Sequence, residues 1–65
     1  MTVVIRSERI GNYAVEISQD KYESTYKVSL DRMINDYEAV RENENYYPDI
    51  KKATARYNRL KRSIR

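Results

Sequence analysis

Residues 13–30 have the sequence YAVEISQDKYESTYKVSL, in which apolar and polar side chains alternate in two separate runs. The apolar positions of these runs are Tyr13, Val15, Ile17, Tyr26, Val28 and Leu30. Alternation with a period of two is typical of antiparallel strands that bury one face. We therefore predict strands over residues 13–18 and 25–30, joined by a polar loop at 19–24.

The residues before this stretch predict a third strand that pairs with the first of the two runs. Residues 3–9 are rich in β-branched side chains and are followed by Gly11-Asn12, which contains the only glycine of the chain. A Gly-Asn pair between two such runs is a strong signal for a tight hairpin, because glycine adopts positive φ without steric cost. Three strands of a meander are therefore expected before residue 31.

Residues 31–45 allow two interpretations. As a helix, this segment would have Asp31 as its N-cap, and the residues sharing one face would be Met33, Ile34, Tyr37 and Val40. As a strand, it would turn at Asn35-Asp36 and pair residues 37–42 with the preceding strand. We favour the strand slightly, and both alternatives remain open.

The last segment predicts an amphipathic helix. Tyr47-Pro48-Asp49 is a helix start in which proline would occupy the first helical position. The apolar residues that follow at intervals of three and four are Ile50, Ala53, Tyr57, Leu60 and Ile64. At 100° per residue they fall within an arc of about 80°, which suits a helix that covers one face of the sheet.

Charge is distributed unevenly along the chain. The net charge is +3, with four acids and four cations in residues 1–30 and a net −4 in residues 31–49. Residues 50–65 contain seven cations and no acid. Those expected on the outer helix face, over an arc of about 140°, are Lys51, Lys52, Arg56, Arg59 and Arg62, with Lys61 and Arg65 beside them. Such a surface is either an ordinary solvated face or the electrostatic footprint of a phosphate-binding protein.

The composition argues against an enzyme. The chain lacks His and Cys, its single glycine excludes a glycine-rich phosphate loop, and Glu42, Glu44 and Asp49 are interpreted as a solvated acidic segment rather than a metal site. We expect no catalytic residue, no metal, no cofactor and no small-molecule substrate. No apolar run approaches the length of a signal peptide or membrane span, so a cytoplasmic location and no membrane contact are expected.

All seven aromatic residues are tyrosines, and three of them are expected in loops: Tyr22, Tyr46 and Tyr47. An exposed tyrosine can contact a partner protein or stack on a base. Tyr47 has a second interpretation, as a hydrophobic staple at the helix entry. Tyr46 and Tyr47 therefore join the five cations as candidate binding residues.

These elements predict one small α+β domain over residues 1–65. It has an antiparallel meander of three or four strands followed by one C-terminal amphipathic helix packed on one sheet face. In topology alone this plan is similar to several small single-stranded-DNA-binding folds, and its three-strand form is similar to the arm-binding domains of some transposon integrases. A fold-level likeness does not establish a function.

Two functions are expected from these features. The first is a non-enzymatic protein that contacts nucleic-acid phosphates through the basic helix. The alternative is a protein–protein interaction module, a small adaptor or inhibitor, as a phage or mobile element would encode, that binds an acidic protein surface. A homodimer in which residues 31–49 of one chain face the basic helix of another is compatible with both.

Overall fold

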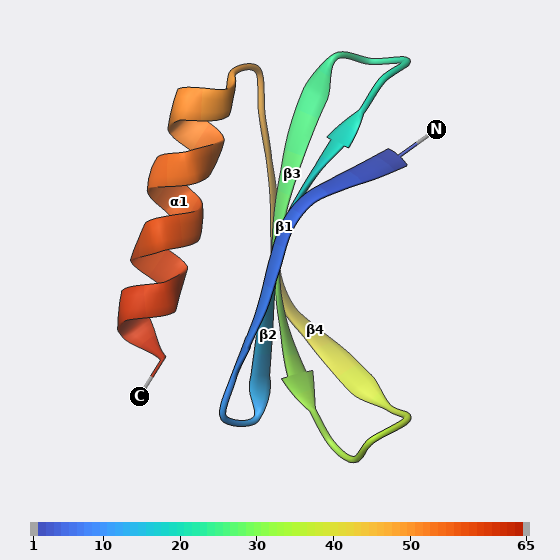
Figure 1. Cartoon of the computed structure of the whole chain (residues 1–65), viewed down its shortest axis with the longest axis vertical. Coiled ribbons are helices and arrows are strands. Elements are labelled where there is room, and N and C mark those ends of the chain that lie inside the picture. Colours follow the sequence, from blue (N-terminus) through green and yellow to red (C-terminus); the bar gives the residue numbers. More distant parts are fainter. Residues whose placement is uncertain (1, 65) are drawn as a thin grey trace.

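A computed structural model describes residues 2–64 of the chain as a four-stranded antiparallel sheet with one helix on one face (Figure 1). The strands are β1 (Thr2–Ile10), β2 (Tyr13–Asp20), β3 (Thr25–Met33) and β4 (Ala39–Tyr47). They lie in chain order, and the helix α1 (Ile50–Ser63) follows. This arrangement confirms the predicted α+β meander with a C-terminal helix.

The first three strands match the sequence expectation and extend it. Ile10 pairs with Tyr13 across the Gly11-Asn12 turn, where Gly11 has φ +59°. An L side chain rarely adopts this backbone conformation, which is why glycine suits the position. The pairing of β1 with β2 is interrupted by a bulge at Ile5. A bulge increases the local twist, and Figure 1 shows that the sheet is strongly twisted.

The ambiguous segment forms a strand, which agrees with the interpretation we favoured. The turn lies at residues 34–38, where the Asn35 side chain accepts hydrogen bonds from the amides of Tyr37 and Glu38. β4 therefore begins at Ala39 and continues to Tyr47, later than the predicted range of 37–42. The loop position predicted for Tyr46 and Tyr47 is wrong, because both residues end β4.

The helix starts at Ile50, two residues later than predicted from the proline. Asp49 is the N-cap and its carboxylate accepts a hydrogen bond from the Lys52 amide at 2.8 Å. Pro48 therefore precedes the cap and does not occupy the first helical position. Tyr47 lies one residue before the position that a hydrophobic staple would use. A side-chain oxygen at the cap satisfies an amide that has no partner within the helix.

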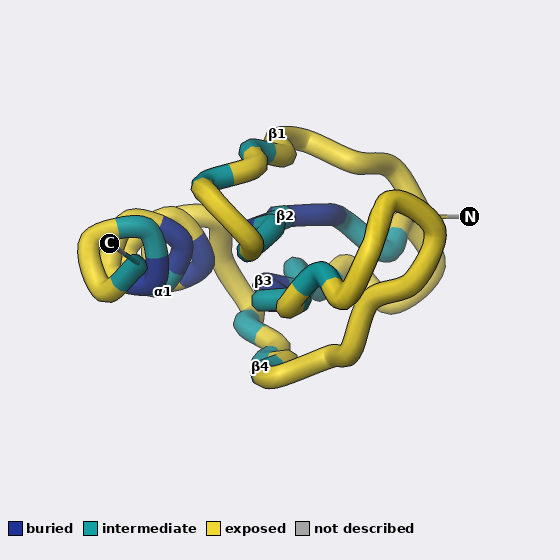
Figure 2. The backbone as a smooth tube through the Cα atoms, turned by 90° about the horizontal axis from the view of Figure 1, so that it is seen from below, coloured by how far each residue is buried: buried dark blue, intermediate teal, exposed yellow. Residues whose placement is uncertain are grey.

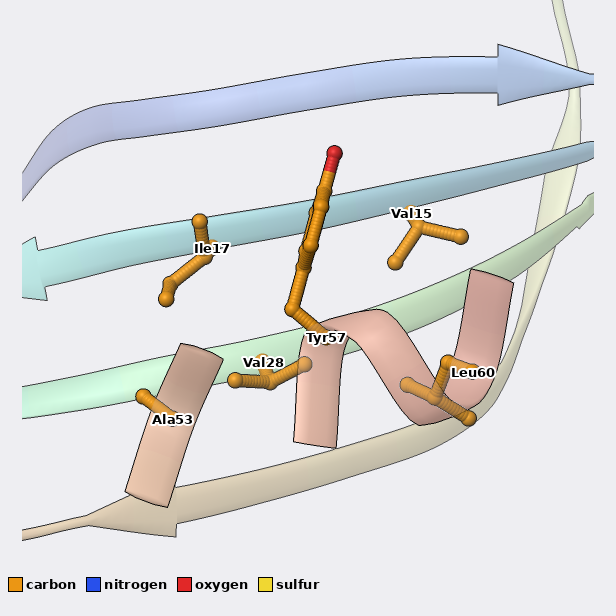
Figure 3. Packing of buried hydrophobic residues seen from close by; sticks show 6 residues of the cluster. All are labelled: Val15, Ile17, Val28, Ala53, Tyr57 and Leu60. Carbon is orange, nitrogen blue, oxygen red and sulfur yellow. The ribbon is translucent and has the colours of Figure 1, made fainter. Parts of the chain in front are cut away.

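The core lies between α1 and the middle of the sheet, as the buried positions in Figure 2 show. Val15, Ile17 and Val28 contribute from the sheet, and the helix contributes Ala53, Tyr57 and Leu60 (Figure 3). Tyr26, Leu30, Tyr47 and Ile64 pack around this cluster, whereas Ile50, predicted on the same stripe, is exposed. No helix among residues 2–64 covers the other face of the sheet, yet Ser18 and Ser29 on that face are buried.

Candidate functional site

Five cations form the outward surface of α1, which we call the basic face: Lys51, Lys52, Arg56, Arg59 and Arg62. The apolar stripe fixes their orientation, because burial of Ala53, Tyr57 and Leu60 against the sheet turns the opposite side of the helix to solvent. Four of the five are exposed, and Arg56 is half-buried. Arg65, predicted beside this surface, lies outside the described residues.

The basic face has no acidic partner among residues 2–64. Two arginines of the sheet form ion pairs with acids of residues 31–49 instead. Arg32 pairs with Glu42 at 2.8 Å, and Arg41 pairs with Asp31 and Glu44. These contacts, the one with Asp31 foremost, raise the pKa of Arg41. The acidic segment therefore forms its ion pairs within the sheet, and the charge of the basic face is not offset by contacts within the described chain.

A shallow hollow of about 330 Å³ lies where the basic face meets the end of β4. Its walls are Tyr47, Lys52, Ala55, Arg56 and Arg59. The Nε of Arg56 is buried from solvent and has no hydrogen-bond partner among the described residues. Because a buried guanidinium N–H without an acceptor is costly, Arg56 contributes an unsatisfied donor next to this hollow. Four of the seven predicted residues thus meet here.

A second, more open hollow of about 570 Å³ lies further around the helix. Ala55, Asn58, Lys61 and Arg62 line it. Ala55 belongs to both hollows, so the small methyl group of this residue separates two cationic surfaces. Composition and charge pattern did not single out Ala55. The sequence feature that could have identified Ala55 is its position as an alanine among cations on the exposed side of the helix.

Tyr46 does not belong to this site. It pairs with Lys27 across β3 and lies on the sheet face without the helix, whereas its neighbour Tyr47 packs toward the core. The Tyr46 hydroxyl donates a hydrogen bond to Glu44 at 3.1 Å, and this contact is the main reason why its pKa is raised. Its ring borders a separate polar hollow of about 90 Å³ near Ser18.

Lys61, also predicted beside the basic face, points toward β1. Its ammonium lies 2.9 Å from Glu8, which also pairs with Arg6 at 3.0 Å. Both cations stand 5.6 Å from the centre of the Tyr57 ring. Figure 3 shows the Tyr57 hydroxyl directed toward β1. Burial is the main cause that raises the pKa of Tyr57, and the Glu8 carboxylate raises it further. This cluster attaches the helix to the first strand.

Within residues 2–64, no group of acidic side chains is placed to hold a metal ion. No helix among these residues is long and apolar enough to span a membrane. Comparisons with protein-family models, with curated proteins and with solved structures give no match to this chain. The arguments for a function therefore rest on the chain's own residues.

Proposed function

We propose that the protein binds nucleic acid through the phosphate backbone, using the basic face of α1, and that it does so as a binding protein without catalytic activity. The observation that carries this proposal is the lack of acidic partners for five outward cations among the described residues. Cations on one helix side without interspersed acids repel one another mildly. Phosphates would remove that repulsion and release counterions from the nucleic acid.

The geometry of the helix supports contact with several phosphates at once. Lys51 and Arg62 are separated by about 16 Å along the helix axis at a rise of 1.5 Å per residue. Arg56, Arg59 and Arg62 can each present a planar fork of donors to phosphate oxygens. Arg56 lines the same hollow as Tyr47 and is half-buried, so its side chain has less freedom than those of its exposed neighbours. Contacts of this kind position a protein on nucleic acid without reading its sequence.

The test is a titration of fluorescent duplex DNA, single-stranded DNA and RNA at a series of salt concentrations. If all five cations meet phosphates of duplex DNA, log K should fall with log salt with a slope of about −4 to −5. Arg59→Glu should weaken binding strongly on every sequence tested. Lys21→Glu is the matched control, because it makes the same change in net charge on an exposed side chain in the β2–β3 turn. It should leave affinity nearly unchanged.

Two results would contradict the proposal. One is the absence of binding to any nucleic acid at low salt. The other is an equal effect of Arg59→Glu and Lys21→Glu, which would mean that only net charge matters. Purification from a native extract, with half of the sample treated with nuclease, tests the alternative. Recovery of an acidic protein partner after nuclease treatment would favour the protein-binding function of the same face.

A further inference from the structure

The outer edge of β1 is open and largely uncharged in its first half. Residues 2–7 are all exposed, and Val3, Val4 and Ile5 are 36%, 53% and 48% exposed. The other edge of the sheet, β4, carries Arg41, Glu42 and Glu44, all joined in ion pairs. Charges discourage the addition of a further strand, whereas an apolar edge invites it. β1 also carries Arg6, Glu8 and Arg9, but residues 2–5 are uncharged and exposed, so β1 is the edge that offers an apolar stretch to another strand.

The hairpin fixes which backbone groups of β1 face outward. Ile10 pairs with Tyr13 across a two-residue turn, and such a turn closes on a hydrogen-bonded pair. Because hydrogen-bonded and non-hydrogen-bonded pairs alternate in an antiparallel ladder, the amides of Ile10 and Glu8 face β2. Those of Arg9 and Ser7 face away from the sheet and are free to bond to another strand.

The charged side chains on either side of Ser7 are complementary to the same side chains of a second, antiparallel copy of β1. If two β1 strands run antiparallel with Ser7 opposite Ser7, Arg6 of each copy stands opposite Glu8 of the other. Both side chains lie on the helix face, since Arg6 pairs with Ile17 and Glu8 with Val15. Arg6 and Glu8 pair with each other at 3.0 Å within one chain. In this register each gains a second opposite charge from the other copy, which stabilises the strand pair.

We propose that the partner of this edge is a second copy of the chain, bound through antiparallel pairing of the two β1 strands about Ser7. The contact is isologous, and its two-fold axis runs perpendicular to the sheet. The two sheets become one sheet of eight strands, and both α1 helices lie on the same side of it. A domain of this size buries only about 60% of the surface that its unfolded chain exposes, less than a larger domain does. Pairing would bury the exposed residues of β1 in addition.

The first experiment measures the mass of the full chain by light scattering and sedimentation from low micromolar to millimolar concentration. A rise from the monomer mass of 7.8 kDa toward twice that value is expected. Arg6→Glu and Glu8→Arg should each remain monomeric, because each puts like charges opposite one another. An equimolar mixture of the two variants should form a heterodimer, since its charges are again complementary. Circular dichroism establishes that each variant is folded.

A second variant keeps the proposal testable if Glu8→Arg fails to fold. The chain has no cysteine, so Ser7→Cys introduces a single thiol at the axis. A hydrogen-bonded antiparallel pair holds its Cα atoms about 5.5 Å apart, within the reach of a disulfide. Mild oxidation should give a covalent dimer, whereas Thr54→Cys on the exposed side of α1 should give little. A monomer mass at every concentration, or equal cross-linking at both positions, would overturn the proposal.

Discussion

Glu8 in β1 and Lys61 in the last turn of α1, 53 residues apart in the chain, form an ion pair with 2.9 Å between carboxylate and ammonium. α1 packs mainly on β2, β3 and β4. The Glu8–Lys61 pair therefore ties the edge strand to the helix, next to the Tyr57 ring. Both side chains are about a third exposed, so the pair is accessible to protons and salt.

Acid should weaken the Glu8–Lys61 ion pair, and the substitution Lys61→Met should reveal this effect. The hydrogen bond from Lys61 is the main reason why the pKa of Glu8 is lowered from its ordinary value of 4.5. A carboxyl group with a lowered pKa in the folded state stabilises the fold above its unfolded-state pKa, and this contribution disappears as the pH falls through the folded-state pKa. Lys61→Met should therefore destabilise the protein at neutral pH, and its effect should become smaller at acidic pH, below the lowered pKa of Glu8.

Urea denaturation at both pH values measures this difference, with Lys51→Met as the control. Lys51 has no acidic partner among the described residues, so its replacement should have a small effect that is alike at both pH values. An effect of Lys61→Met that is equal at neutral and acidic pH would show that the ion pair does not stabilise the fold.

The buried Tyr57 hydroxyl should contribute little to stability, whereas the ring should contribute much. The hydroxyl makes no hydrogen bond of normal distance and angle among the described residues, although Glu8 is near enough to raise its pKa, and the side chain is 1% exposed. Tyr57→Phe should leave the free energy of unfolding unchanged or raise it by about 1 kcal/mol. Tyr57→Ala should lower it by about 3 to 5 kcal/mol through the cavity it leaves. Chemical denaturation measures both, and a large loss in Tyr57→Phe would indicate a hydrogen bond to the hydroxyl.

The helix cap offers a local test of where α1 begins. Asp49→Ala should lower the free energy of unfolding by about 1 kcal/mol, because the Lys52 amide loses its acceptor. Asp49→Asn should retain most of that stability, since an amide oxygen also accepts the bond. Asp36→Ala in the exposed β3–β4 turn is the control for loss of a carboxylate. Equal losses at positions 36 and 49 would argue against the cap.

Ala55 allows the charge of the basic face to be changed in either direction without removing a contact. Alanine, lysine and glutamate all favour helices, so substitutions here should preserve the fold. Ala55→Lys should strengthen binding to duplex DNA and make the salt slope steeper by about one unit. Ala55→Glu should weaken binding, because it places a carboxylate between the two hollows. Fluorescence titration measures both, and the same response in both variants would contradict the proposed interface.

The alternating side chains of residues 13–30 were enough to predict the centre of the sheet, because period two leaves little freedom about which face is buried. The single Gly-Asn turn likewise fixed the first hairpin. Residues 31–45 could not be decided from local pattern. β4 has few apolar side chains, and the pairing of its charges with Asp31 and Arg32 becomes visible only when the strands are aligned.

The helix stripe predicted which cations point outward, but it did not predict their surroundings. Lys61 lies close to the apolar stripe on the helical wheel, yet its contact with Glu8 depends on the sheet register and could not be read from either segment alone. Both Tyr46 and Tyr47 were expected in a loop before the helix, and only Tyr47 had a second interpretation, as a hydrophobic staple. They lie on opposite faces of the sheet because β4 extends to residue 47. The proline that follows suggested instead that the strand had already ended.

The sheet side of the core is covered by α1, the last element among the described residues. During synthesis, the three hairpins can pair as soon as they emerge, since each joins neighbouring strands. Val15, Ile17 and Val28 nevertheless stay open to solvent until Ala53, Tyr57 and Leu60 arrive. A nascent chain halted before residue 53 would present a bare apolar sheet face to chaperones, proteases and other nascent chains. Synthesis and packing of α1 therefore remove this apolar sheet face from solvent.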